Sequence, residues 1–509
     1  MLAQVLSGAV AGVDGLMVQV EVDLAMGLPS FSTVGLAEGA VREAKDRVKA
    51  AVKNSGYEFP TGKITVNLAP ASVRKEGAGY DLPIALGILA ASGVIAPMSL
   101  QASLVIGELS LDGTVKPVRG MLSMAIAAAA GGVRRLLVPL ANGPEAAVIT
   151  DLEVIGIQHL SQAVEFLRGI IVLEPTVVDL EALFRIHSVH GPDFEDVKGQ
   201  EHAKRALEIA ASGGHNILLS GSPGSGKTMM ARRLPSILPD LTLEEALETS
   251  KVFSTIDCLP PDNPLITARP FRAPHHTISD AGLIGGGHVP RPGEVSLAHN
   301  GVLFLDELLE FKKHVLEVLR QPLEDGVVTI SRATMSLAFP AKFMLAAAMN
   351  PCPCGYQGDP FHVCTCTPAQ IQRYRSRLSG PLLDRIDMYI EVPAVQVSEL
   401  ARLQPGESSV SIRNRVNSAR RIQKARFLSS RGINCNAQME PKEVKDFCRL
   451  DSAGAKLLEG AVTKLGLSAR SHTRILKIAR TIADLAGMEE ISSCFLSEAI
   501  QYRRMNLER

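Results

Sequence analysis

Apolar and polar positions in residues 1–170 alternate between a two-residue period and a helical one. Short apolar runs bounded by turn residues predict strands at 18–24, 64–68, 104–106 and 136–138. Segments rich in small residues predict helices at 41–54 and 121–130. The uncharged stretch 82–107 is long enough to span a bilayer, but Gly, Pro and Ser interrupt it, so we expect a buried helix, a turn and a strand. This region is predicted to fold as a self-contained α/β unit.

The pattern after residue 170 predicts a linker, a second α/β domain and a helical domain. Residues 171–192 include Pro175 and the pair Gly191-Pro192 around an unpatterned middle, which is typical of a linker. Residues 193–395 carry buried strands, and residues 396–509 carry apolar side chains at three- and four-residue spacing. The helices expected in this last part are 410–428, 442–448, 453–464 and 470–485.

Composition narrows the class of protein only slightly. The chain has 509 residues, enough for roughly two to four domains, and 53 basic residues against 53 acidic ones. That balance gives no global basic field, so any nucleic-acid site must be a local patch. The first residues lack a basic stretch before an apolar one, which argues against a signal peptide. We expect a cytoplasmic protein with no membrane partner, whose 8 cysteines do not form a disulfide framework.

The octapeptide GSPGSGKT at 221–228 lies between an apolar run and a helix-like segment, which is the context of a phosphate-binding loop. Its glycines let backbone N–H groups and the following helix N-terminus face a triphosphate. Lys227 adds a positive charge, and Thr228 supplies a hydroxyl for Mg²⁺. The residues expected to bind nucleotide are Gly221, Ser222, Pro223, Gly224, Ser225, Gly226, Lys227 and Thr228. The sequence therefore predicts a site for ATP with Mg²⁺.

Two later strands are expected to deliver polar groups to this site. Residues 301–307 read GVLFLDE, a buried strand that ends in two carboxylates. We expect Asp306 to hold Mg²⁺ and Glu307 to polarise the attacking water. The strand 343–349 ends at Asn350, whose amide would orient that water beside the γ-phosphate. The alternatives are a solvated acidic turn for the two carboxylates and an ordinary turn residue for Asn350.

Directly after Asn350, the loop 351–367 contains two Cys-x-Cys pairs separated by nine residues. Cys352, Cys354, Cys364 and Cys366 offer four thiolates, which suit tetrahedral coordination of one Zn²⁺. A closed set of four ligands predicts a structural site, and a loop with few core-forming residues needs such a cross-link. Because the loop leaves Asn350 directly, we expect its order to link a DNA-facing or intersubunit surface to the nucleotide site. The alternatives are reduced, unligated thiols, or His362 in place of one cysteine.

The order of these motifs resembles the AAA+ ATPases. The phosphate-binding loop, the strand ending in Asp-Glu and the strand ending in Asn are followed by LLDRID at 382–387 and by helices. Three segments resemble, more narrowly, the magnesium-chelatase-like ComM/YifB family: FRAPHHTISDAGLIGGG at 271–287, PGEVSLAHNGVLFLDEL at 292–308 and SARSHTRILKIARTIADLAG at 468–487. The resemblance spans nearly the whole chain. Photosynthetic chelatase motor subunits differ in carrying a short acidic segment in place of the cysteine cluster.

This resemblance implies roles for two arginines. Arg385 of LLDRID corresponds to the arginine finger, which reaches the nucleotide of a neighbouring subunit, and Arg470 to the lid arginine called sensor 2. Arg474 is the alternative for the second role, and a surface ion pair with Asp384 or Asp387 is the alternative for Arg385. An arginine that completes a site in trans implies a ring, and the AAA+ resemblance implies a homohexamer.

The segments 64–93 and 107–132 resemble the catalytic fold of Lon protease, itself related to a ribosomal-protein-like α/β fold. Aligned on the glycines, the positions of the nucleophilic serine and its lysine fall at Gly79 and Leu122. Neither side chain supplies an oxygen nucleophile or an amine, so we do not expect peptidase activity. Ser72 with Lys75 or Lys63 stays as an alternative pair.

The same domain is expected to serve packing, ring assembly or guidance of nucleic acid. One of its helices presents a basic face made of Arg42, Lys45, Lys49 and Lys53. That face is either a DNA-tracking stripe or an ordinary solvated surface.

Two inserted segments are candidates for DNA contact. Residues 327–340 contain two β-rich runs joined around Arg332, which is typical of a hairpin. In the AAA+ branch with this insertion the hairpin projects into the ring channel, so the resemblance places Arg332 on the DNA backbone. The glycine-rich stretch 282–292 resembles the other channel-facing insertion of the family, with Arg291 and His288 as candidate contacts. An exposed arginine on an ordinary hairpin is the alternative for Arg332.

A local basic bias follows these insertions. From 370 to 431 the chain has twelve Lys or Arg against five Asp or Glu. Tyr374 and Phe427 are the candidates for stacking on bases there. We expect His275 and His276 to be structural.

These patterns and resemblances together predict an ATP-dependent, homohexameric motor on single-stranded and branched DNA. The implied fold is a Lon-protease-like α/β domain at 1–170, a linker at 171–192, an AAA+ P-loop α/β domain with hairpin inserts at 193–395, and a helical lid at 396–509. The implied process is branch migration during recombination of incoming DNA in natural transformation, with a recombinase as a further candidate partner. A chelatase-type motor that remodels a partner protein for metal insertion is the alternative, followed by a Lon-like protease.

Overall fold

The computed structural model describes residues 1–35, 39–71, 75, 77–186, 191–260, 263–287, 290–332, 335–394, 405–430, 432–466 and 468–503. At residues 39–42, 186, 332 and 335 only the backbone is described. The chain divides into two compact units, which we call unit 1 (Met1–Arg185 with Ala246–Ile266) and unit 2 (Ile186–Glu245 with Thr267–Arg509). No helix in the described ranges combines the length and the apolar character needed to cross a membrane.

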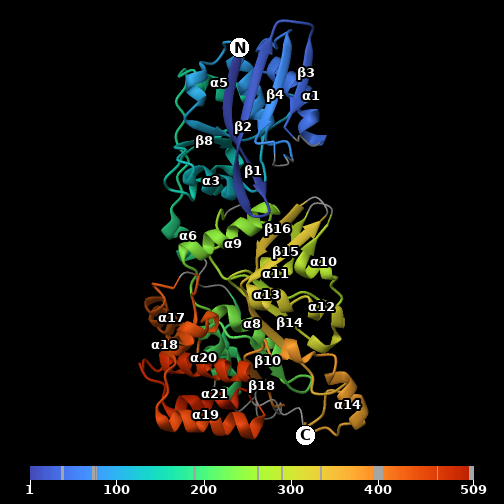
Figure 1. Ribbon diagram of the computed structural model, residues 1–509, viewed down its shortest axis with the longest axis vertical. Coiled ribbons are helices and arrows are strands. Elements are labelled where there is room, and N and C mark those ends of the chain that lie inside the picture. Colours follow the sequence, from blue (N-terminus) through green and yellow to red (C-terminus); the bar gives the residue numbers. More distant parts are fainter. Residues whose placement is uncertain are drawn as a thin grey trace. The chain divides into compact units, whose positions relative to one another are not determined.

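In the described part of unit 1, seven strands form one sheet in the order β3-β4-β2-β1-β5-β8-β9, and β6 (Glu108–Leu109) pairs with β7 (Val115–Lys116) apart from it. The seven strands are β1 (Leu2–Ala11), β2 (Asp14–Ala25), β3 (Ser30–Val34), β4 (Lys63–Ala69), β5 (Ser103–Val105), β8 (Arg135–Pro139) and β9 (Glu153–Ile157). β1 and β2 form an antiparallel hairpin, from which β5, β8 and β9 continue in parallel (Figure 1). The strands predicted at 18–24, 64–68, 104–106 and 136–138 are confirmed as β2, β4, β5 and β8. The sequence patterns did not predict β1, β3 or β9.

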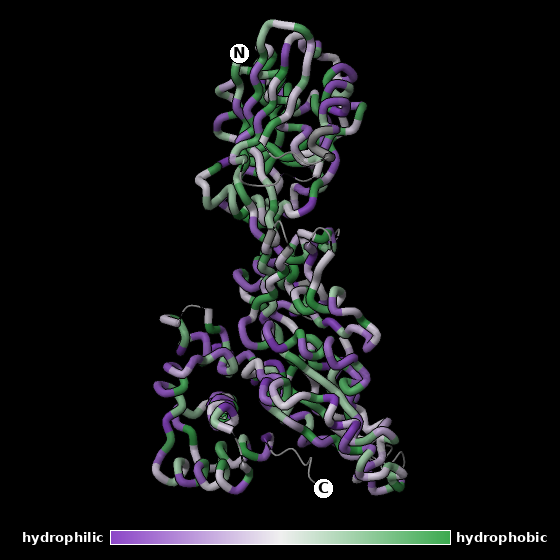
Figure 2. The backbone as a smooth tube through the Cα atoms, turned by 45° about the vertical axis from the view of Figure 1, so that its right-hand side comes forward, coloured by the Kyte–Doolittle hydropathy of each residue, from purple (hydrophilic) through white to green (hydrophobic). Residues whose placement is uncertain are grey.

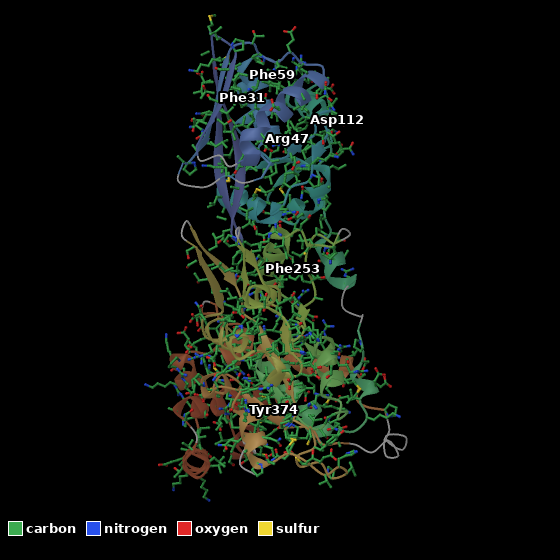
Figure 3. All side chains as sticks on the ribbon, turned by 90° about the vertical axis from the view of Figure 1, so that its right-hand side faces the viewer. Phe31, Arg47, Phe59, Asp112, Phe253 and Tyr374 are labelled. Carbon is green, nitrogen blue, oxygen red and sulfur yellow. The ribbon has the colours of Figure 1, made fainter. Side chains whose placement is uncertain are left out.

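Helices of unit 1 bury apolar side chains in two cores. The helices are α1 (Gly39–Asn54), α2 (Asp81–Ala91), α3 (Met121–Ala130), α4 (Gly143–Ala147), α5 (Leu160–Leu167), α6 (Leu180–Ile186) and most of α9 (Leu243–Thr255). α1 and α2 share one core with β2, and α3 shares the other with β5 and β8. α2 is buried along its whole length, which confirms the predicted sequence of buried helix, turn and strand within 82–107. The buried carboxylate of Asp81, the first residue of α2, is stabilised by an ion pair with Arg47 at 2.7 Å; Arg47 is labelled in Figure 3.

Residues Ala246–Ile266 belong to unit 1 although they follow the phosphate-binding loop in sequence. Lys251 pairs with Asp14 at 2.6 Å, and the hydroxyl of Ser254 donates to Glu145. Burial raises the pKa of the Glu145 carboxyl, and the hydrogen bonds that it accepts oppose this shift. The sequence predicted one continuous domain at 193–395, whereas the structure assigns residues Ala246–Ile266 within that range to unit 1. Hydrophobic periodicity could not predict this, because it carries no information about contacts between residues distant in sequence. The boundary of a separate lid near 396 stays a prediction.

The described residues of unit 2 form a parallel sheet of five strands in the order β11-β14-β17-β10-β18. The strands are β10 (Ile217–Ser220), β11 (Phe271–Arg272), β14 (Val302–Leu305), β17 (Met344–Met349) and β18 (Met388–Glu391). Two antiparallel pairs stand apart from this sheet. They are β12 (Gly285–Gly286) with β13 (Arg291–Pro292), and β15 (Val327–Arg332) with β16 (Met335–Pro340), the second of which is labelled in Figure 1. Parallel order brings the carboxyl ends of the five strands to one edge.

Unit 2 contains two groups of helices. One group lies before and between the strands in sequence, and the other comes from the C-terminal part of the chain. The first group is α7 (Glu201–Gly213), α8 (Lys227–Ile237), α10 (Asp280–Ile284), α11 (Glu294–Leu297), α12 (Lys313–Glu317), α13 (Arg320–Asp325), α14 (Pro368–Arg375) and α15 (Gly380–Leu383). The C-terminal helices are α17 (Ser409–Arg426), α18 (Pro441–Phe447), α19 (Ser452–Leu465), α20 (Ala469–Leu485) and α21 (Ser493–Gln501). Hydrophobic and hydrophilic residues mix along these C-terminal helices (Figure 2), and their buried side chains share one core with the sheet. The four predicted helices are confirmed, whereas α21 was not predicted.

Candidate functional site

The phosphate-binding loop connects β10 to α8, as the sequence predicted. Gly224 and Gly226 have φ of 76° and 91°, a backbone conformation that side chains with a Cβ rarely adopt. A methyl group at Gly221 would lie 2.3 Å from the carbonyl oxygen of Val392, so a larger residue does not fit there. The loop therefore has the curled backbone that presents N–H groups to phosphate oxygens at the start of α8.

Lys227 lies inside this loop. Its ammonium donates to the carbonyl oxygens of Gly221 and Ser222 at 2.7 and 2.9 Å, and to Oδ1 of Asn350 at 3.3 Å. Burial lowers the pKa of Lys227, and the charge of Asp306 opposes this shift. The lysine that would neutralise phosphate charge and the amide predicted to sense it are thus in direct contact.

The residues predicted to hold Mg²⁺ meet at the same edge. The hydroxyl of Thr228 donates to Oδ2 of Asp306 at 2.7 Å, although the two residues are distant in sequence. Asp306 follows β14, Asn350 follows β17 and the loop follows β10, and these three strands are neighbours in the sheet. A hydroxyl and a carboxylate suit a hard cation, so these two ligands fit Mg²⁺ bound to a nucleoside triphosphate. When bound, the ion would neutralise charge on the transferred phosphoryl group.

Glu307 adopts a left-handed backbone conformation with φ of 49°. This conformation is rare for a residue with a side chain and tends to occur at functional sites. The side chain is 58% exposed, and its Oε2 lies 3.4 Å from Nδ1 of His276. We expected His276 to be structural, but it faces the predicted catalytic glutamate. The neighbouring strands β11 and β14 place both residues at one sheet edge, a relation that the sequence pattern alone does not show.

Arg385, Arg470 and Arg474 lie at the other end of the sheet. The carbonyl of Arg385 accepts from the side-chain amide of Asn216, which directly precedes β10. β10 spans 4 residues, roughly 13 Å, and separates this end from the phosphate-binding loop. None of these arginines is therefore placed to contact a nucleotide in the loop of its own chain.

These arginines are held by carboxylates. Arg385 is 8% exposed and pairs with Glu324 of α13, not with Asp384 or Asp387 as the alternative interpretation expected. Arg470 Nη2 lies 3.8 Å from Oε1 of the same Glu324, so one carboxylate lies between the two arginines. The sequence motif could not reveal Glu324, because it lies 61 residues before Arg385.

Arg474 instead serves the packing of the sheet against α20. It pairs with Asp387 at 2.6 Å. Burial raises the pKa of the Asp387 carboxyl, but the positive charge of Arg474 and a hydrogen bond with His215 hold this pKa well below its usual range. A cavity of about 770 Å³ opens at this end of the sheet, lined in part by Arg385, Arg470, Arg474 and Glu324. This arrangement favours Arg470 over Arg474 as the more available side chain.

The four predicted metal ligands lie together. Cys352 Sγ is 3.4 Å from Cys354 Sγ and 3.7 Å from Cys364 Sγ, and the ligand atoms of Cys352, Cys354, Cys364 and Cys366 all lie within 4.8 Å of one another. Four sulfurs at about 2.3 Å around one Zn²⁺ would be roughly 3.8 Å apart, whereas a disulfide would need about 2.05 Å. The cluster therefore has the spacing of a tetrahedral metal site and could hold an ion such as zinc.

The surroundings of the cluster also suit a metal. Backbone N–H groups of Tyr356 and Thr365 lower the pKa of the Cys354 thiol and so favour its thiolate, whereas burial raises the pKa of Cys352 to about 12. His362, the alternative ligand, lies outside this group of four and has its Nδ1 3.2 Å from Asp359. The four cysteines are thus the better ligand set.

The hairpin predicted at 327–340 is confirmed. Thr329 pairs with Ala338, and Arg332 pairs with Met335. The side chain of Arg332 lies outside the described part of the structure, as does His288 of the other insertion. Arg291 is exposed on β13, and a methyl group at Gly285 of β12 would lie 2.9 Å from Cδ1 of Ile330. The two insertions therefore contact each other.

Part of the basic bias at 370–431 is neutralised by ion pairs, although Arg373, Arg421 and Lys424 are exposed. Five arginines of this segment pair with carboxylates, in the pairs Arg377–Glu310, Arg385–Glu324, Arg413–Asp240, Arg415–Glu208 and Arg426–Asp484. Tyr374 and Phe427, at 9% and 4% exposure, are too buried to stack on bases, so that expectation is wrong. Phe427 packs edge-on against Phe447 at 5.9 Å, and burial raises the pKa of Tyr374 to about 12. Apolar side chains in this segment were needed for the core.

In unit 1, Gly79 and Leu122 occupy the positions aligned with the nucleophilic serine and the lysine of Lon protease. Leu122 is fully buried, and a methyl group at Gly79 would contact Val118 at 3.4 Å. Neither position offers a nucleophile or a base. Lys75 is buried, which lowers its pKa, and its ammonium donates to the carbonyl of Pro70. Ser72 lies outside the described residues.

The basic face of α1 is partly described. Lys45, Lys49 and Lys53 are exposed, whereas Ala44 and Val48 are buried in the core. The side chain of Arg42 lies outside the described residues. Both interpretations of this face, a DNA-tracking stripe and a solvated surface, stay open.

Comparisons with protein-family models cover most of the chain. Residues 193–400 match the family described as magnesium chelatase, subunit ChlI. Residues 20–142 match subunit ChlI of Mg-chelatase, and residues 406–503 match the C-terminal part of magnesium chelatase subunit ChlI.

Two relatives that match along nearly their full length show which branch of this family the chain resembles. The chain is 46% identical over 511 residues to competence protein ComM of Haemophilus influenzae, covering 99% of this chain and 98% of that protein. It is 44% identical over 501 residues to YifB of Escherichia coli, covering 98% and 96% of the two chains. A shorter match, 32% identical over 162 residues, joins 29% of this chain to 28% of Lon protease 2 of Bacillus subtilis. The chain therefore belongs to the magnesium-chelatase-like AAA+ family that includes competence protein ComM and YifB.

Proposed function

We propose that the protein is an ATP-dependent motor that acts on DNA as a homohexameric ring. Family membership indicates ATPase activity. The observation that carries the assignment is the meeting of Lys227, Thr228, Asp306 and Asn350 at the carboxyl ends of three neighbouring strands. Glu307 would polarise the attacking water, and Mg²⁺ held by Thr228 and Asp306 would neutralise charge on the transferred phosphoryl group.

The ring is supported by the position of the arginines. Arg385 and Arg470 lie a strand's length from the phosphate-binding loop of their own chain, so they would complete the site of a neighbouring subunit. Glu324, which pairs with both, would have to release them when a triphosphate arrives. Six copies are the number that the AAA+ resemblance implies.

Action on DNA is supported by the relatives and by the two insertions. Competence protein ComM is similar along the full length, and its name refers to competence. We infer branch migration or strand separation of single-stranded and branched DNA during recombination in natural transformation, with a recombinase as a partner. Hairpins that carry Arg332 and Arg291 lie side by side, so each subunit would offer two cations to a DNA backbone in the channel.

Incubation with labelled four-way and linear DNA tests this proposal. The wild-type protein should convert branched DNA to exchanged strands with ATP and not without it. Arg332→Ala should lower DNA affinity and reduce the salt dependence by about one phosphate contact per engaged subunit, with strand exchange lost. Arg449→Ala, which removes an exposed arginine outside both hairpins, is the matched control and should behave as wild type.

A chelatase-type motor is the second candidate, because all three family models describe magnesium-chelatase subunits. Such a motor would hydrolyse ATP in response to a partner protein and leave branched DNA unchanged. ATPase activity with no DNA stimulation and no strand exchange, in both wild type and Arg332→Ala, would favour this candidate.

We also propose that the cysteine cluster holds one structural Zn²⁺. Protein purified without chelator should contain about one equivalent of zinc per chain, because four sulfurs leave no open coordination position. Elemental analysis measures the metal, and titration with a thiol reagent under native conditions measures free cysteines. Cys364→Ser should lose the zinc, whereas Cys258→Ser, at an exposed cysteine elsewhere, should keep it. Less than about half an equivalent, with four additional reactive thiols, would contradict the assignment.

A further inference from the structure

The cysteine loop, residues 351–367, directly follows a residue of the predicted nucleotide site. It begins next to Asn350, whose Oδ1 accepts from the ammonium of Lys227 at 3.3 Å. Cys352, the first metal ligand, follows two residues later and is fully buried. One metal ligand is thus joined to the residue that contacts the phosphate-binding lysine by a single intervening proline.

A second contact lies at the tip of the phosphate-binding loop. Gly355 directly follows the metal ligand Cys354 and has φ of 87°. A methyl group at this position would lie 2.6 Å from Cδ of Pro223. The backbone at Gly355 therefore packs closely against the tip, which is otherwise exposed at Pro223 and Gly224.

Asp359 makes a third contact. Its side chain is 1% exposed, and Oδ1 accepts from the backbone N–H groups of Phe361 and His362, both at 2.9 Å. The hydroxyl of Ser222 also donates to this carboxylate, and that bond is the largest cause of a pKa of about 2 at Asp359. The carbonyl of Ser222 in turn accepts from Lys227 at 2.9 Å. A chain of polar contacts thus runs from the cysteine loop through Ser222 to the phosphate-binding lysine.

The loop itself has little else to hold its shape. Residues 351–367, all within the described structure, form no helix or strand, and only Cys352 and Gly355 are buried as whole residues. Ordering a chain costs backbone entropy at every residue, so a segment with so little burial needs a cross-link. The four cysteines at metal-binding distance supply one. Arg375 at the end of α14 helps by donating to Gln357 at 3.0 Å and to the carbonyl of Pro351 at 3.2 Å.

We propose that the metal-bound cysteine loop holds the phosphate-binding loop in its nucleotide-binding form, with Asp359 as the positioning residue that acts through Ser222. The inference rests on the proposed ATP and zinc sites and adds a regulation: metal loading sets nucleotide affinity. The sequence alone predicted that an ordered loop links a DNA-facing or intersubunit surface to the nucleotide site. The contacts of Gly355 and Asp359 with the phosphate-binding loop instead favour a direct effect of the metal on nucleotide affinity.

A double-mutant cycle tests the route through Ser222. The full-length chain carries Asp359→Asn, Ser222→Ala or both, and binding of a fluorescent ATP analogue with Mg²⁺ is measured beside zinc content. Asn keeps one oxygen for the backbone N–H groups but loses the charge. Asp359→Asn should retain zinc and weaken nucleotide binding about tenfold, the loss expected for one hydrogen bond to a charged group. The double variant should be no weaker than the stronger single one. Unchanged affinity, or two effects that add, would overturn the role of Asp359.

Removing the metal tests the coupling itself. Cys364→Ser should lose zinc and bind nucleotide at least tenfold more weakly, while Cys494→Ser, at an exposed cysteine of α21, should match wild type in both. A zinc-free Cys364→Ser protein with wild-type affinity, or a wild type that binds nucleotide without zinc, would overturn the inference. If Cys364→Ser fails to fold, the double-mutant cycle still decides. Because binding is measured without turnover, a wild type that binds ATP in a zinc-dependent way but does not move DNA would refute only the motor.

Discussion

Replacing Glu307 with Gln is expected to slow ATP hydrolysis about 10²- to 10⁴-fold, the range attributed to general-base catalysis. The amide keeps the size of the side chain but does not take a proton from water. Thr228 and Asp306, which meet at 2.7 Å, are unchanged, so nucleotide and Mg²⁺ should still bind. Phosphate release in the steady state and binding of a fluorescent ATP analogue measure the two properties separately.

Lys227→Ala is the contrasting variant. It removes the charge that faces the phosphates and the contact with Asn350, so binding and hydrolysis should be lost together. Wild-type turnover in Glu307→Gln would show that another group positions the water. His276, 3.4 Å from Glu307, would then be the first residue to examine.

Replacing Arg385 with Ala is expected to lower ATP hydrolysis about 10³-fold or more, the effect of removing an arginine finger. The residue lies at the amino ends of the strands, away from its own phosphate-binding loop. Each Arg385→Ala subunit therefore keeps a complete set of Lys227, Asp306 and Glu307. Mixing it with Glu307→Gln subunits should restore part of the hydrolysis, because some interfaces then combine an intact glutamate with an intact arginine.

Assembly must be measured in the same samples. Arg385 also donates to the carbonyl of Arg320 at 3.1 Å, so its removal could loosen α13 and the ring with it. Sedimentation of each variant with a non-hydrolysable ATP analogue controls for this. If rings form and no mixing ratio restores hydrolysis, Arg385 does not act in trans. Arg470→Ala, treated in the same way, tests the second arginine held by Glu324.

Local pattern predicted many elements of this protein because their periodicity is a property of neighbouring residues. The C-terminal helices α17 to α20 and the strands β2, β4, β5 and β8 follow from apolar spacing alone. β1 was missed although its residues alternate, and α21 was missed although the shorter α18 was predicted. The excursion of Ala246–Ile266 into unit 1 could not be predicted, since it depends on contacts such as Lys251 with Asp14.

The sequence by itself determined the candidate residues of the nucleotide site and the four cysteines that could bind a metal. GSPGSGKT, the Asp-Glu pair and the Cys-x-Cys pairs are short motifs whose function depends on residue type and local spacing. Only the tertiary structure decided which of these groups meet. It placed Glu324 between Arg385 and Arg470, His276 against Glu307, and the cysteine loop against Pro223 and Ser222. Each of those contacts joins segments far apart in the chain, and strand order and packing, not local pattern, bring such segments together.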